Sequence, residues 1–493
     1  MACNTSETGG CNGVSWEVSR IDFPKDFVFG VATSAYQVEG ARREGGKGDS
    51  IWDIFSDKKE NIKDRSNGEI AIDQYHRYKE DVELMAKLGF GAYRFSISWT
   101  RIFPDGLGTK INEDGVIYYN NLIDSLLEKG IQPYATLYHW DLPYFLHESR
   151  GGWLSENIVQ YFALYAEACF EKFGDRVKHW ITINEPRQTA LSGYGFGFFA
   201  PGRHQNSSVE PYLAAHYQLL AHAAAVDVYR KKFKDVQGGV IGLTIDSEWA
   251  EPFSDKLEDK KAADRWLEFQ LGCYLDPIYY GDYPLSMRER VGDQLPKFSE
   301  AEKELLKNAT DFIGLNHYTT RFVAHAQNTG GLHFHQVQEV DGLVKSQSGE
   351  AIGERAASEW LYVVPWGLRK LLNYIAKRYH DPIIYITENG MDQEETETAS
   401  LEEVLDDKMR VEYHKTYLAS VAGAIRDGVD VRGYFAWSFA DNFEWAQGYT
   451  KRFGLIYVDY KNDLARYPKS SAIWFSSFLK SNDQDGGQQV NQD

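Results

Sequence analysis

Two glutamates stand at the ends of short apolar runs. Glu185 lies in TINEP at 182–186, and Glu388 lies in ITENG at 386–390. A single glutamate in such a place is more often a helix cap or a salt-bridge partner. Two of them, accompanied by amides, a histidine and indoles, instead favour a pair of carboxyl groups that work together. One would donate a proton while the other acts as a base or nucleophile.

Other polar and aromatic side chains also stand at the ends of predicted strands. They are Gln37, Arg94, His139, Asn184, Asn316, Tyr318 and Trp437. Taken alone, His139 and the tryptophans would most often be core residues. Two carboxyl groups among such side chains are the arrangement that hydrolysis of a glycosidic bond requires.

The elements that must position these residues alternate along the chain. Short runs rich in β-branched and aromatic residues are followed by longer segments of helical period, such as Tyr75–Leu88 and Asn157–Phe173, which is typical of repeated βα units. The expected strands are Phe27–Gln37, Ala92–Trp99, Gln132–Trp140, His179–Pro186, Val240–Ile245, Phe312–Tyr318, Ile383–Asn389 and Val431–Phe439. Eight strands close a (β/α)8 barrel, whose active sites lie at the carboxyl ends of the strands. The candidate residues therefore converge on one site.

The chain is one domain in this interpretation. A plain barrel needs about 250 residues, so much of this 493-residue chain must form inserted loops that shape the site. Low-complexity polar sequence is confined to the two ends, and no Pro- or Ser-rich linker divides the interior. We therefore expect a flexible N-terminal segment at 1–18, a barrel domain at 19–481 and a disordered tail at 482–493.

Charge and cysteine content restrict the partners and the compartment. The net charge of −19 would repel nucleic acid and anionic membrane surfaces. The first twenty residues lack a signal-peptide pattern, and no apolar run approaches the length of a membrane span. The four scattered cysteines suggest neither a disulfide framework nor a zinc or redox motif. We therefore expect a cytoplasmic protein with a small-molecule partner, no nucleic-acid or membrane partner, and no metal or other cofactor.

Several longer segments carry a family resemblance. Together with TINEP and ITENG they are FVFGVATSAYQVEG at 27–40, YRFSISW at 93–99, YHWDLP at 138–143 and DNFEW at 441–445. They resemble the signature segments of the glycoside hydrolase family 1 β-glucosidases, over about residues 20 to 480. The overall pattern, including SEWAEP at 247–252, is similar to that of plant members.

The resemblance implies a retaining mechanism with a covalent glucosyl-enzyme intermediate. Glu388 would be the nucleophile and Glu185 the acid/base, with carboxyl groups about 5–5.5 Å apart. Arg94 would hold Glu388 ionised, and the negative charge of Glu388 would raise the pKa of Glu185. An alternative for Arg94 is a structural ion pair inside the barrel, and both roles are compatible.

The resemblance also implies a sugar-binding set. Gln37, His139, Glu444 and Trp445 resemble the family's ligands for the ring hydroxyls, Asn184 resembles its 2-hydroxyl ligand, and Trp437 is the expected floor under the sugar. Tyr318 resembles the residue that donates to the nucleophile, with Asn316 and Phe453 as further candidates for the pocket. Trp360 resembles an aromatic platform for flat leaving groups, although packing under a loop explains it equally well.

Three departures from related branches narrow the expectation. Glu185 replaces the glutamine of sulphur-glycoside relatives, which favours an O-glycosidase. Glu444 and Trp445 stand where phosphosugar relatives carry serine and a basic residue, which argues against a 6-phosphate substrate. The segment 200–211 lacks the cysteine pair of secreted plant relatives, which favours a non-secreted branch.

The leading hypothesis is a β-glucosidase acting on small aryl, secondary-metabolite or short oligosaccharide glucosides, with water as second substrate. One alternative is a transglucosidase, which would pass the same intermediate to another acceptor. Another is a non-catalytic sugar-binding barrel, against which the intact pair Glu185 and Glu388 weighs. Assembly into a homo-oligomer is compatible with the sequence.

Overall fold

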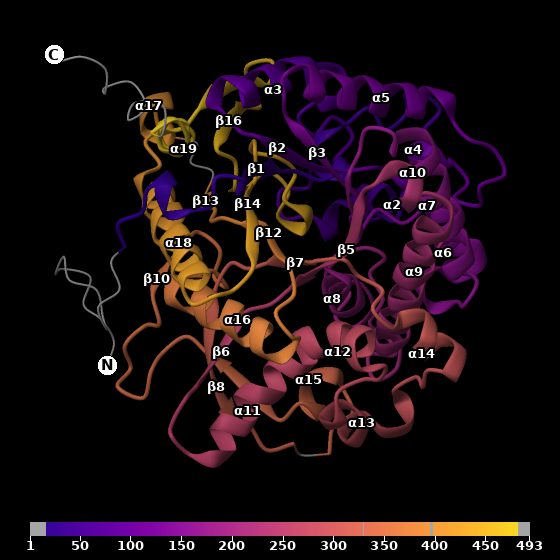
Figure 1. The fold of residues 1–493 in the computed structure, drawn as a ribbon, viewed down its shortest axis with the longest axis vertical. Coiled ribbons are helices and arrows are strands. Elements are labelled where there is room, and N and C mark those ends of the chain that lie inside the picture. Colours follow the sequence, from indigo (N-terminus) through magenta and orange to yellow (C-terminus); the bar gives the residue numbers. More distant parts are fainter. Residues whose placement is uncertain (1–15, 329, 395–397, 482–493) are drawn as a thin grey trace, which may run out of the picture.

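The computed structural model describes residues 16–328, 330–394 and 398–481. It confirms the predicted closed barrel of eight parallel strands (Figure 1). In chain order the barrel strands are β1 (Val28–Ala32), β2 (Ala92–Ser96), β3 (Gln132–Tyr138), β4 (His179–Asn184), β5 (Val240–Asp246), β7 (Ile313–Asn316), β12 (Ile384–Asn389) and β14 (Val431–Trp437). The predicted segment 1–18, apart from residues 16–18, and the predicted tail 482–493 lie outside the described residues.

Each predicted strand falls on a barrel strand, but several predicted strands extend past the observed end, the first of them farthest. β1 ends at Ala32, and a short helix, α1 (Ala35–Val38), carries Gln37. Both segments are buried, and burial alone gives an apolar run the same appearance in a strand and in a helix. Gln37 therefore reaches the rim of the barrel from a helix and not from a strand end.

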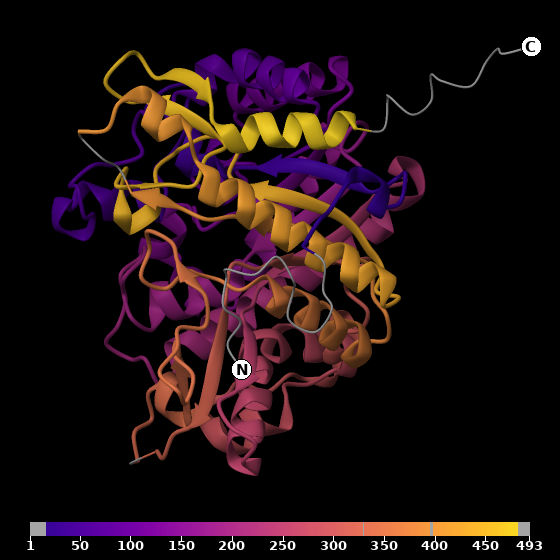
Figure 2. The same ribbon diagram turned by 90° about the vertical axis from the view of Figure 1, so that its left-hand side faces the viewer.

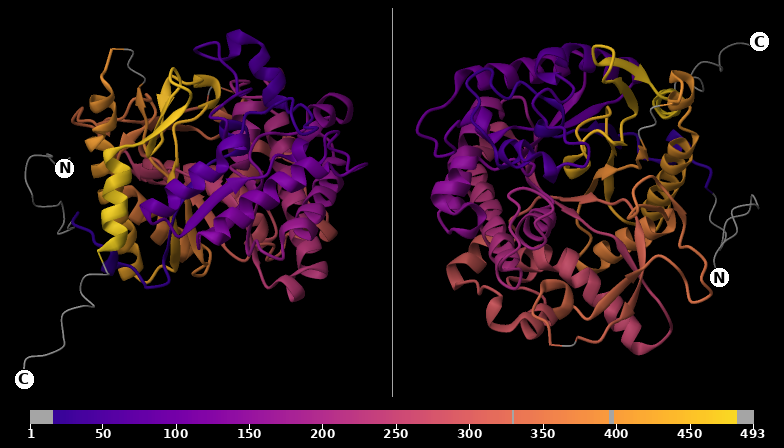
Figure 3. Two further views of the ribbon diagram at one scale, coloured as in Figure 1. Left: turned by 90° about the horizontal axis from the view of Figure 1, so that it is seen from above. Right: turned by 180° about the vertical axis from the view of Figure 1, so that it is seen from behind.

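Long helices surround the barrel on all sides (Figures 1 and 3). They are α3 (Gln74–Leu88), α5 (Glu113–Glu128), α7 (Ile158–Phe173), α9 (Glu210–Lys232), α11 (Leu257–Leu267), α12 (Cys273–Tyr280), α16 (Pro365–Arg378), α18 (Lys408–Arg426) and α19 (Ser470–Lys480). The predicted stripe of α7 is buried, including Phe162, Tyr165 and Cys169. Helices α18 and α19 lie side by side and close the ring next to α3 (Figure 2).

The barrel strands are buried on both faces. Every residue of β2, β7 and β12 is buried, as expected for parallel strands covered by helices outside and by packed side chains within. This double burial explains why these strands read as nearly continuous apolar runs. Because the strands are packed on both faces, the strand ends provide fixed positions for polar side chains.

Loops inserted after the strands form smaller elements. A three-stranded sheet that the sequence analysis did not predict joins β6 (Trp249–Pro252), β8 (Thr320–His325) and β9 (Val340–Leu343), and α11 contacts all three strands. The strands β6 and β8 follow closely on β5 and β7, so this sheet extends from the carboxyl end of the barrel.

The remaining short elements connect the barrel units. The helices are α2 (Ile51–Asp57), α4 (Trp99–Ile102), α6 (Tyr144–Arg150), α8 (Pro186–Gln188), α10 (Lys234–Gln237), α13 (Leu285–Val291), α14 (Glu300–Leu306), α15 (Phe334–Val337) and α17 (Leu401–Leu405), and the strands are β10 (Glu354–Arg355), β11 (Tyr362–Val363), β13 (Gln393–Glu394), β15 (Lys451–Arg452), β16 (Ile456–Asp459) and β17 (Ala465–Pro468). None of the described helices is long and apolar enough to cross a membrane. Within the described ranges, no cluster of three or more histidine, cysteine or acidic side chains could hold a metal ion.

Candidate active site

A cleft of about 1320 Å³ opens at the carboxyl ends of the barrel strands. Ten of the predicted site residues line it: His139, Glu185, Asn316, Tyr318, Trp360, Glu388, Trp437, Glu444, Trp445 and Phe453. The other three, Gln37, Arg94 and Asn184, are fully buried behind this lining. They hydrogen-bond to Glu444, Glu388 and His139, respectively.

Three neighbouring strands end in register at the cleft. Asp246 on β5 pairs with Asn316 on β7, and Asn316 pairs with Glu388 on β12. An irregularity in the pairing between Ile386 and Glu388 sets this register. Bulges at barrel rims commonly re-aim a side chain in this way. The result is a row of carboxyl, amide and carboxyl groups across three adjacent strands.

Glu388 is held by a cation and a hydroxyl. Arg94 Nη1 lies 2.5 Å from Oε1, and the Tyr318 hydroxyl donates to Oε2 over 2.8 Å. Arg94 also donates to Asn184 Oδ1 over 2.6 Å, which fixes the guanidinium between two strands. Burial raises the pKa of Glu388, while Arg94 and the hydrogen bonds from Tyr318 and Asn316 oppose this shift. These contacts offset part of the effect of burial on the Glu388 carboxyl group, although the net shift of its pKa is upward.

Glu185 begins the turn that leaves β4. Its φ of 46° lies in the left-handed region, and its N–H donates to Thr244 O on the next strand over 2.9 Å. Pro186 starts the short helix α8 directly after it, which suits the first helical position because proline lacks an N–H. The side chain accepts a hydrogen bond of 2.7 Å from Asn316 Nδ2.

The environment of Glu185 favours its protonated form. Burial raises its pKa well above the usual range, and the negative charges of Asp246 and then Glu388 add to this, against the amide of Asn316 and the charge of Arg187. The effect of Glu388 was expected from the sequence. The effect of Asp246, which is the larger of the two charge effects, was not.

Aromatic rings and a neutral histidine form one wall of the cleft. The His139 ring stacks between Trp437, 5.7 Å away, and Trp445, 5.9 Å away. Burial lowers the pKa of His139 well below its usual value, and Arg94 adds to this. Asn184 Nδ2 lies 3.1 Å from His139 Nε2. In the neutral ring this places the hydrogen on Nδ1.

Gln37 and Glu444 form a second polar pair. Gln37 Nε2 donates to Phe443 O and Asn442 Oδ1, each over 3.0 Å, and lies 3.4 Å from Glu444 Oε2. Burial raises the pKa of Glu444 to about 8, with the charges of Asp392 and Glu388 contributing. A carboxyl group in this state can accept or donate a hydrogen bond to a sugar hydroxyl.

A buried ionic cluster anchors the loop that carries Glu444 and Trp445. Asp441 accepts from Lys469 Nζ over 2.7 Å, from Arg452 Nη1 over 2.7 Å and from Gly454 N over 3.0 Å. Asp441 is fully buried, and both cations are nearly so. The loop that carries Glu444 and Trp445 is therefore held in place from behind by buried ion pairs.

Trp360 and Phe453 both contact the ring of Tyr318. Their rings meet the tyrosine edge-on, with centroids 5.8 Å and 6.1 Å away. Phe453 is buried, whereas Trp360 is 46% exposed. Trp360 thus lies at the entrance of the cleft, where a leaving group could contact it.

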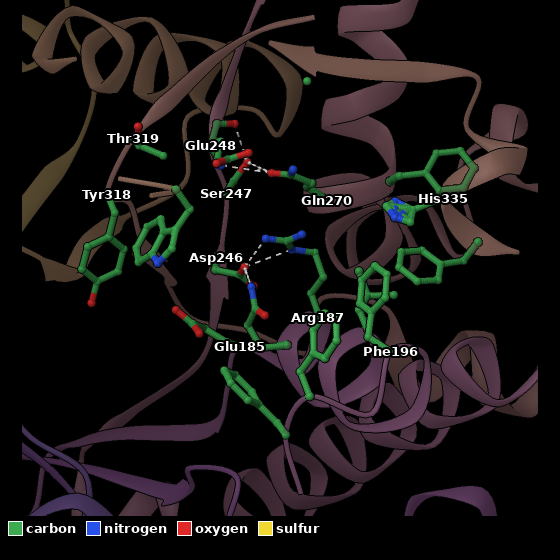
Figure 4. Close-up of a pocket in the computed structure, with 18 of the residues that line it drawn as sticks. Glu185, Arg187, Phe196, Asp246, Ser247, Glu248, Gln270, Tyr318, Thr319 and His335 are labelled. Atoms are coloured by element: carbon green, nitrogen blue, oxygen red, sulfur yellow. Dashed lines mark hydrogen bonds and ion pairs between the residues drawn. The ribbon is translucent and has the colours of Figure 1, made fainter. Parts of the chain in front are cut away.

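The structure adds residues that the sequence analysis missed (Figure 4). Asp246, Arg187, Gln270 and Phe196 all line the cleft. Asp246 carried a usable signal, because it is the last residue of β5 and the predicted strand stopped one residue earlier, at Ile245. The other three lie on inserted segments, where no strand-end rule applies.

Comparisons with known proteins agree with this geometry. The model of the family described as Glycosyl hydrolase family 1 matches residues 19–484. Beta-glucosidase 4 of Oryza sativa subsp. japonica is 67% identical over 482 residues, covering 98% of this chain and 100% of the relative. Beta-glucosidase 42 of Arabidopsis thaliana is 62% identical over 470 residues, covering 95% and 96%.

Solved structures give the same result. A rice β-glucosidase mutant in a covalent complex with glucose superimposes with a TM-score of 0.93 at 50% identity, covering 94% of this chain and 100% of that one. A family 1 β-glucosidase from the fungus Humicola insolens, in complex with glucose, gives 0.91 at 43% identity, covering 93% and 98%. This chain therefore belongs to glycosyl hydrolase family 1, as an O-glycosyl hydrolase of the β-glucosidase type.

Proposed function

We propose that Glu388 is the nucleophile and Glu185 the acid/base of this enzyme. As a family 1 β-glucosidase the protein cleaves β-O-glucosidic bonds through a covalent glucosyl-enzyme intermediate. One observation carries the assignment of roles. Among the described contacts, Glu388 forms an ion pair with Arg94, whereas the partner of Glu185 is the neutral amide of Asn316. The first environment suits an anion and the second a proton donor.

In the first step the Glu388 carboxylate attacks the anomeric carbon while Glu185 protonates the departing oxygen. The bond from the anomeric carbon to the leaving group breaks, and an ester bond to Glu388 forms. Tyr318 and Arg94 hold the attacking carboxylate in place. The charges of Asp246 and Glu388, together with burial, keep the proton on Glu185 until the leaving group takes it.

In the second step Glu185 acts as a base. Glu388 is now an uncharged ester, so the repulsion that held the proton on Glu185 has decreased. Glu185 removes a proton from water, and the resulting nucleophile displaces Glu388 from the anomeric carbon. Two inversions at this carbon give net retention of the β configuration.

The wall behind Glu388 suits a glucose ring. The indole of Trp437 offers an apolar surface for the C–H face of the sugar, and Glu444, backed by Gln37, offers hydrogen bonds to equatorial hydroxyls. The cleft of about 1320 Å³ is larger than one sugar needs, and its lining extends to Trp360, Arg187 and Phe196. We infer that the leaving groups are aryl groups or short sugars.

We also propose that the enzyme belongs to a non-secreted branch and works in the cytoplasm. Cys169 and Cys273 are buried free thiols, and the segment 200–211 has no cysteine. The glycosylation sequons at Asn206 and Asn308 are exposed, so a secreted protein would display them to the glycosylation machinery. Fractionation of source tissue should recover the enzyme in the cytosol, insensitive to endoglycosidase; glycosylated enzyme would contradict the proposal.

Trapping the intermediate tests the proposed chemistry. Brief incubation with 2-deoxy-2-fluoro-β-glucosyl fluoride slows the second step, because fluorine destabilises the oxocarbenium-like transition state. Peptide mass spectrometry should find one fluoroglucosyl group on Glu388, and the Glu388→Gln variant should remain unlabelled. A label on another residue, or none on the folded protein, would refute the assignment. Product analysis with an added alcohol would measure the share of transglucosylation.

A further inference from the structure

The leaving-group side of the cleft contains a guanidinium held in a fixed orientation. Arg187 follows Glu185 by two residues, and its Nε and Nη2 lie 2.9 Å and 2.5 Å from Asp246 Oδ2. Gln188 donates to the same oxygen over 2.8 Å. Because two of the three guanidinium nitrogens bind one carboxylate, the third, Nη1, has a fixed position. It has no hydrogen-bond partner among the described residues.

A second donor stands beside it. Gln270 lines the cleft from the π-helical segment Glu268–Gly272. Its Oε1 accepts from Ser247 Oγ over 3.2 Å and from Glu248 N over 3.0 Å. The NH2 group on the other side of this amide has no partner within the described part of the chain. Ser247 directly follows Asp246, so the two donors belong to one connected network (Figure 4).

Neither free donor is sealed away from the cleft. The buried polar atoms that lack a partner include Asp246 Oδ1 but neither Arg187 Nη1 nor Gln270 Nε2. The Arg187 side chain is 18% exposed. A ligand in the cleft can therefore reach both N–H groups, and hydrogen bonds from a charged donor are the stronger kind.

An apolar surface lies next to this network, on the side away from Glu185 (Figure 4). The rings of Phe196 and Phe198 stack with centroids 5.2 Å apart and planes 4° apart, and Phe198 is 66% exposed. Figure 4 shows Phe196 on the other side of the Arg187 chain from Glu185. A ring bonded to the scissile oxygen would meet the N–H donors close to Glu185 and the aromatic surface farther from it.

We propose that Arg187 and Gln270 determine specificity by binding an acceptor oxygen on the ring next to the scissile bond, and that Asp246 positions Arg187 for this contact. The inference rests on the proposed function of Glu185 and Glu388. The acceptor is an ether, hydroxyl or carbonyl oxygen. It could belong to a substituted aryl ring or to a second sugar, because both can carry such an oxygen on the ring next to the scissile bond.

A pair of isosteric substrates tests the contact. Methoxyphenyl and ethylphenyl β-glucosides, each substituted at position 3 or 4, differ mainly in one oxygen that accepts a hydrogen bond. The wild-type kcat/KM should be higher for a methoxy compound. In Arg187→Met the ratio of methoxy to ethyl should fall about tenfold, and in Gln270→Leu about threefold, as for a charged and a neutral donor. Hydrolysis of cellobiose, relative to that of ethylphenyl glucoside, tests the sugar arm.

The ethylphenyl substrates distinguish a loss of specificity from a structural disturbance of Glu185, which lies two residues before Arg187. A structural effect of Arg187→Met would lower both members of a pair equally. The matched control is Arg230→Met, which breaks a similar pair with Asp311 (2.6 Å) before β7, at the other end of the barrel; it should leave all ratios unchanged. A lower ratio of methoxyphenyl to ethylphenyl hydrolysis supports the proposal with an aryl oxygen as the acceptor. A lower ratio of cellobiose to ethylphenyl hydrolysis supports it with a sugar oxygen as the acceptor, and a decrease in both ratios supports both acceptors. Unchanged ratios in both variants would overturn it, whereas absence of label on Glu388 would instead overturn the proposed function.

Discussion

The two ends of the cleft are built differently. At the glycone end, Arg94, His139, Asn184 and Glu388 bind one another in a continuous buried network. Glu444 forms a separate pair with Gln37 beside it. The leaving-group end comprises Arg187, Phe196, Asp246, Gln270 and Trp360. Asp246 ends the barrel strand β5, and the other side chains come from inserted loops and helices. That end has N–H groups without a protein partner in the described chain and aromatic rings open to solvent.

This difference suggests that the residues of one end carry out the reaction, whereas those of the other end select the substrate. A network that has formed before substrate arrives loses little free energy to reorganisation, so it can hold charge in place for the reaction. Free donors and exposed rings gain partners only when a ligand binds, so they discriminate between ligands. Damage to the glycone end should therefore affect all substrates alike, and damage to the leaving-group end should depend on the leaving group.

The strongest test of this contrast is Glu388→Gln. It removes the nucleophile, and kcat should fall by roughly four orders of magnitude or more, as for other enzymes that lose a covalent nucleophile. The loss should be equal for nitrophenyl, methoxyphenyl and ethylphenyl β-glucosides in steady-state assays. A circular dichroism spectrum like that of the wild type serves as the folding control. A loss that varies strongly with the leaving group would break the proposed division.

Glu185→Gln should have the next largest effect on turnover, and the size of this effect should depend on the leaving group. Loss of general acid catalysis costs about 10²- to 10⁴-fold, but a dinitrophenyl group needs no proton to depart. Its first step should be nearly normal, with the intermediate accumulating as a burst, whereas ethylphenyl glucoside should suffer the full loss. Azide, a nucleophile that needs no base, should restore turnover of the dinitrophenyl substrate. Equal loss on both substrates would contradict the role of Glu185.

The pH dependence of kcat/KM should change in the same variant. Burial, Asp246 and Glu388 raise the pKa of Glu185, so the protonated form that catalysis needs persists towards neutral pH and is lost as the pH rises. The wild type should therefore lose activity on the alkaline side. In Glu185→Gln, assayed with the dinitrophenyl substrate, that alkaline limb should be absent. A retained limb would assign it to another group.

The contrast also explains what the sequence could predict. Strand ends in a barrel are fixed by the register of neighbouring strands, so the rule that active-site residues follow strands placed Asn316 and Glu388 correctly in the cleft. Asp246 escaped only because β5 is one residue longer than predicted. Gln270 escaped for a physical reason: it reaches the cleft through contacts with Ser247 and Glu248, more than twenty residues earlier in the chain, and no local pattern announces such contacts. The small sheet of β6, β8 and β9 was missed for the same reason. Its strands are short, and the segments that pair with one another lie far apart in the sequence.

A third variant, Asp441→Asn, tests how firmly the glycone end is anchored. It leaves Lys469 and Arg452 buried without their carboxylate, which should lower the free energy of unfolding by about 3 kcal/mol. Burial raises the pKa of Asp441, but Lys469 and Arg452 outweigh it, so the net shift is downward. The stabilisation is therefore present above the unfolded-state pKa and is lost as the pH falls through the folded-state value.

Urea denaturation of wild type and Asp441→Asn measures this difference. It should be large at pH 7 and should shrink at acid pH. Asp406→Asn is the control, because its pair with Lys408 (2.6 Å) is exposed, and its unfolding midpoint should match that of the wild type. If Asp441→Asn and Asp406→Asn have the same unfolding midpoint, the buried cluster does not anchor the loop that carries Glu444 and Trp445.

The smallest expected effect belongs to Trp360→Ala at the entrance. Trp360 is 46% exposed and touches Tyr318 edge-on, so its removal leaves the buried hydrogen bond between Tyr318 and Glu388 in place. If it is a platform, stacking worth about 1 kcal/mol is lost, and KM for naphthyl glucoside should rise roughly fivefold while KM for methyl glucoside stays constant. If it only packs under its loop, both KM values should stay constant and the melting temperature should fall. Equal increases for both substrates would mean that Trp360 acts through Tyr318, and would shift it from the leaving-group end to the glycone end.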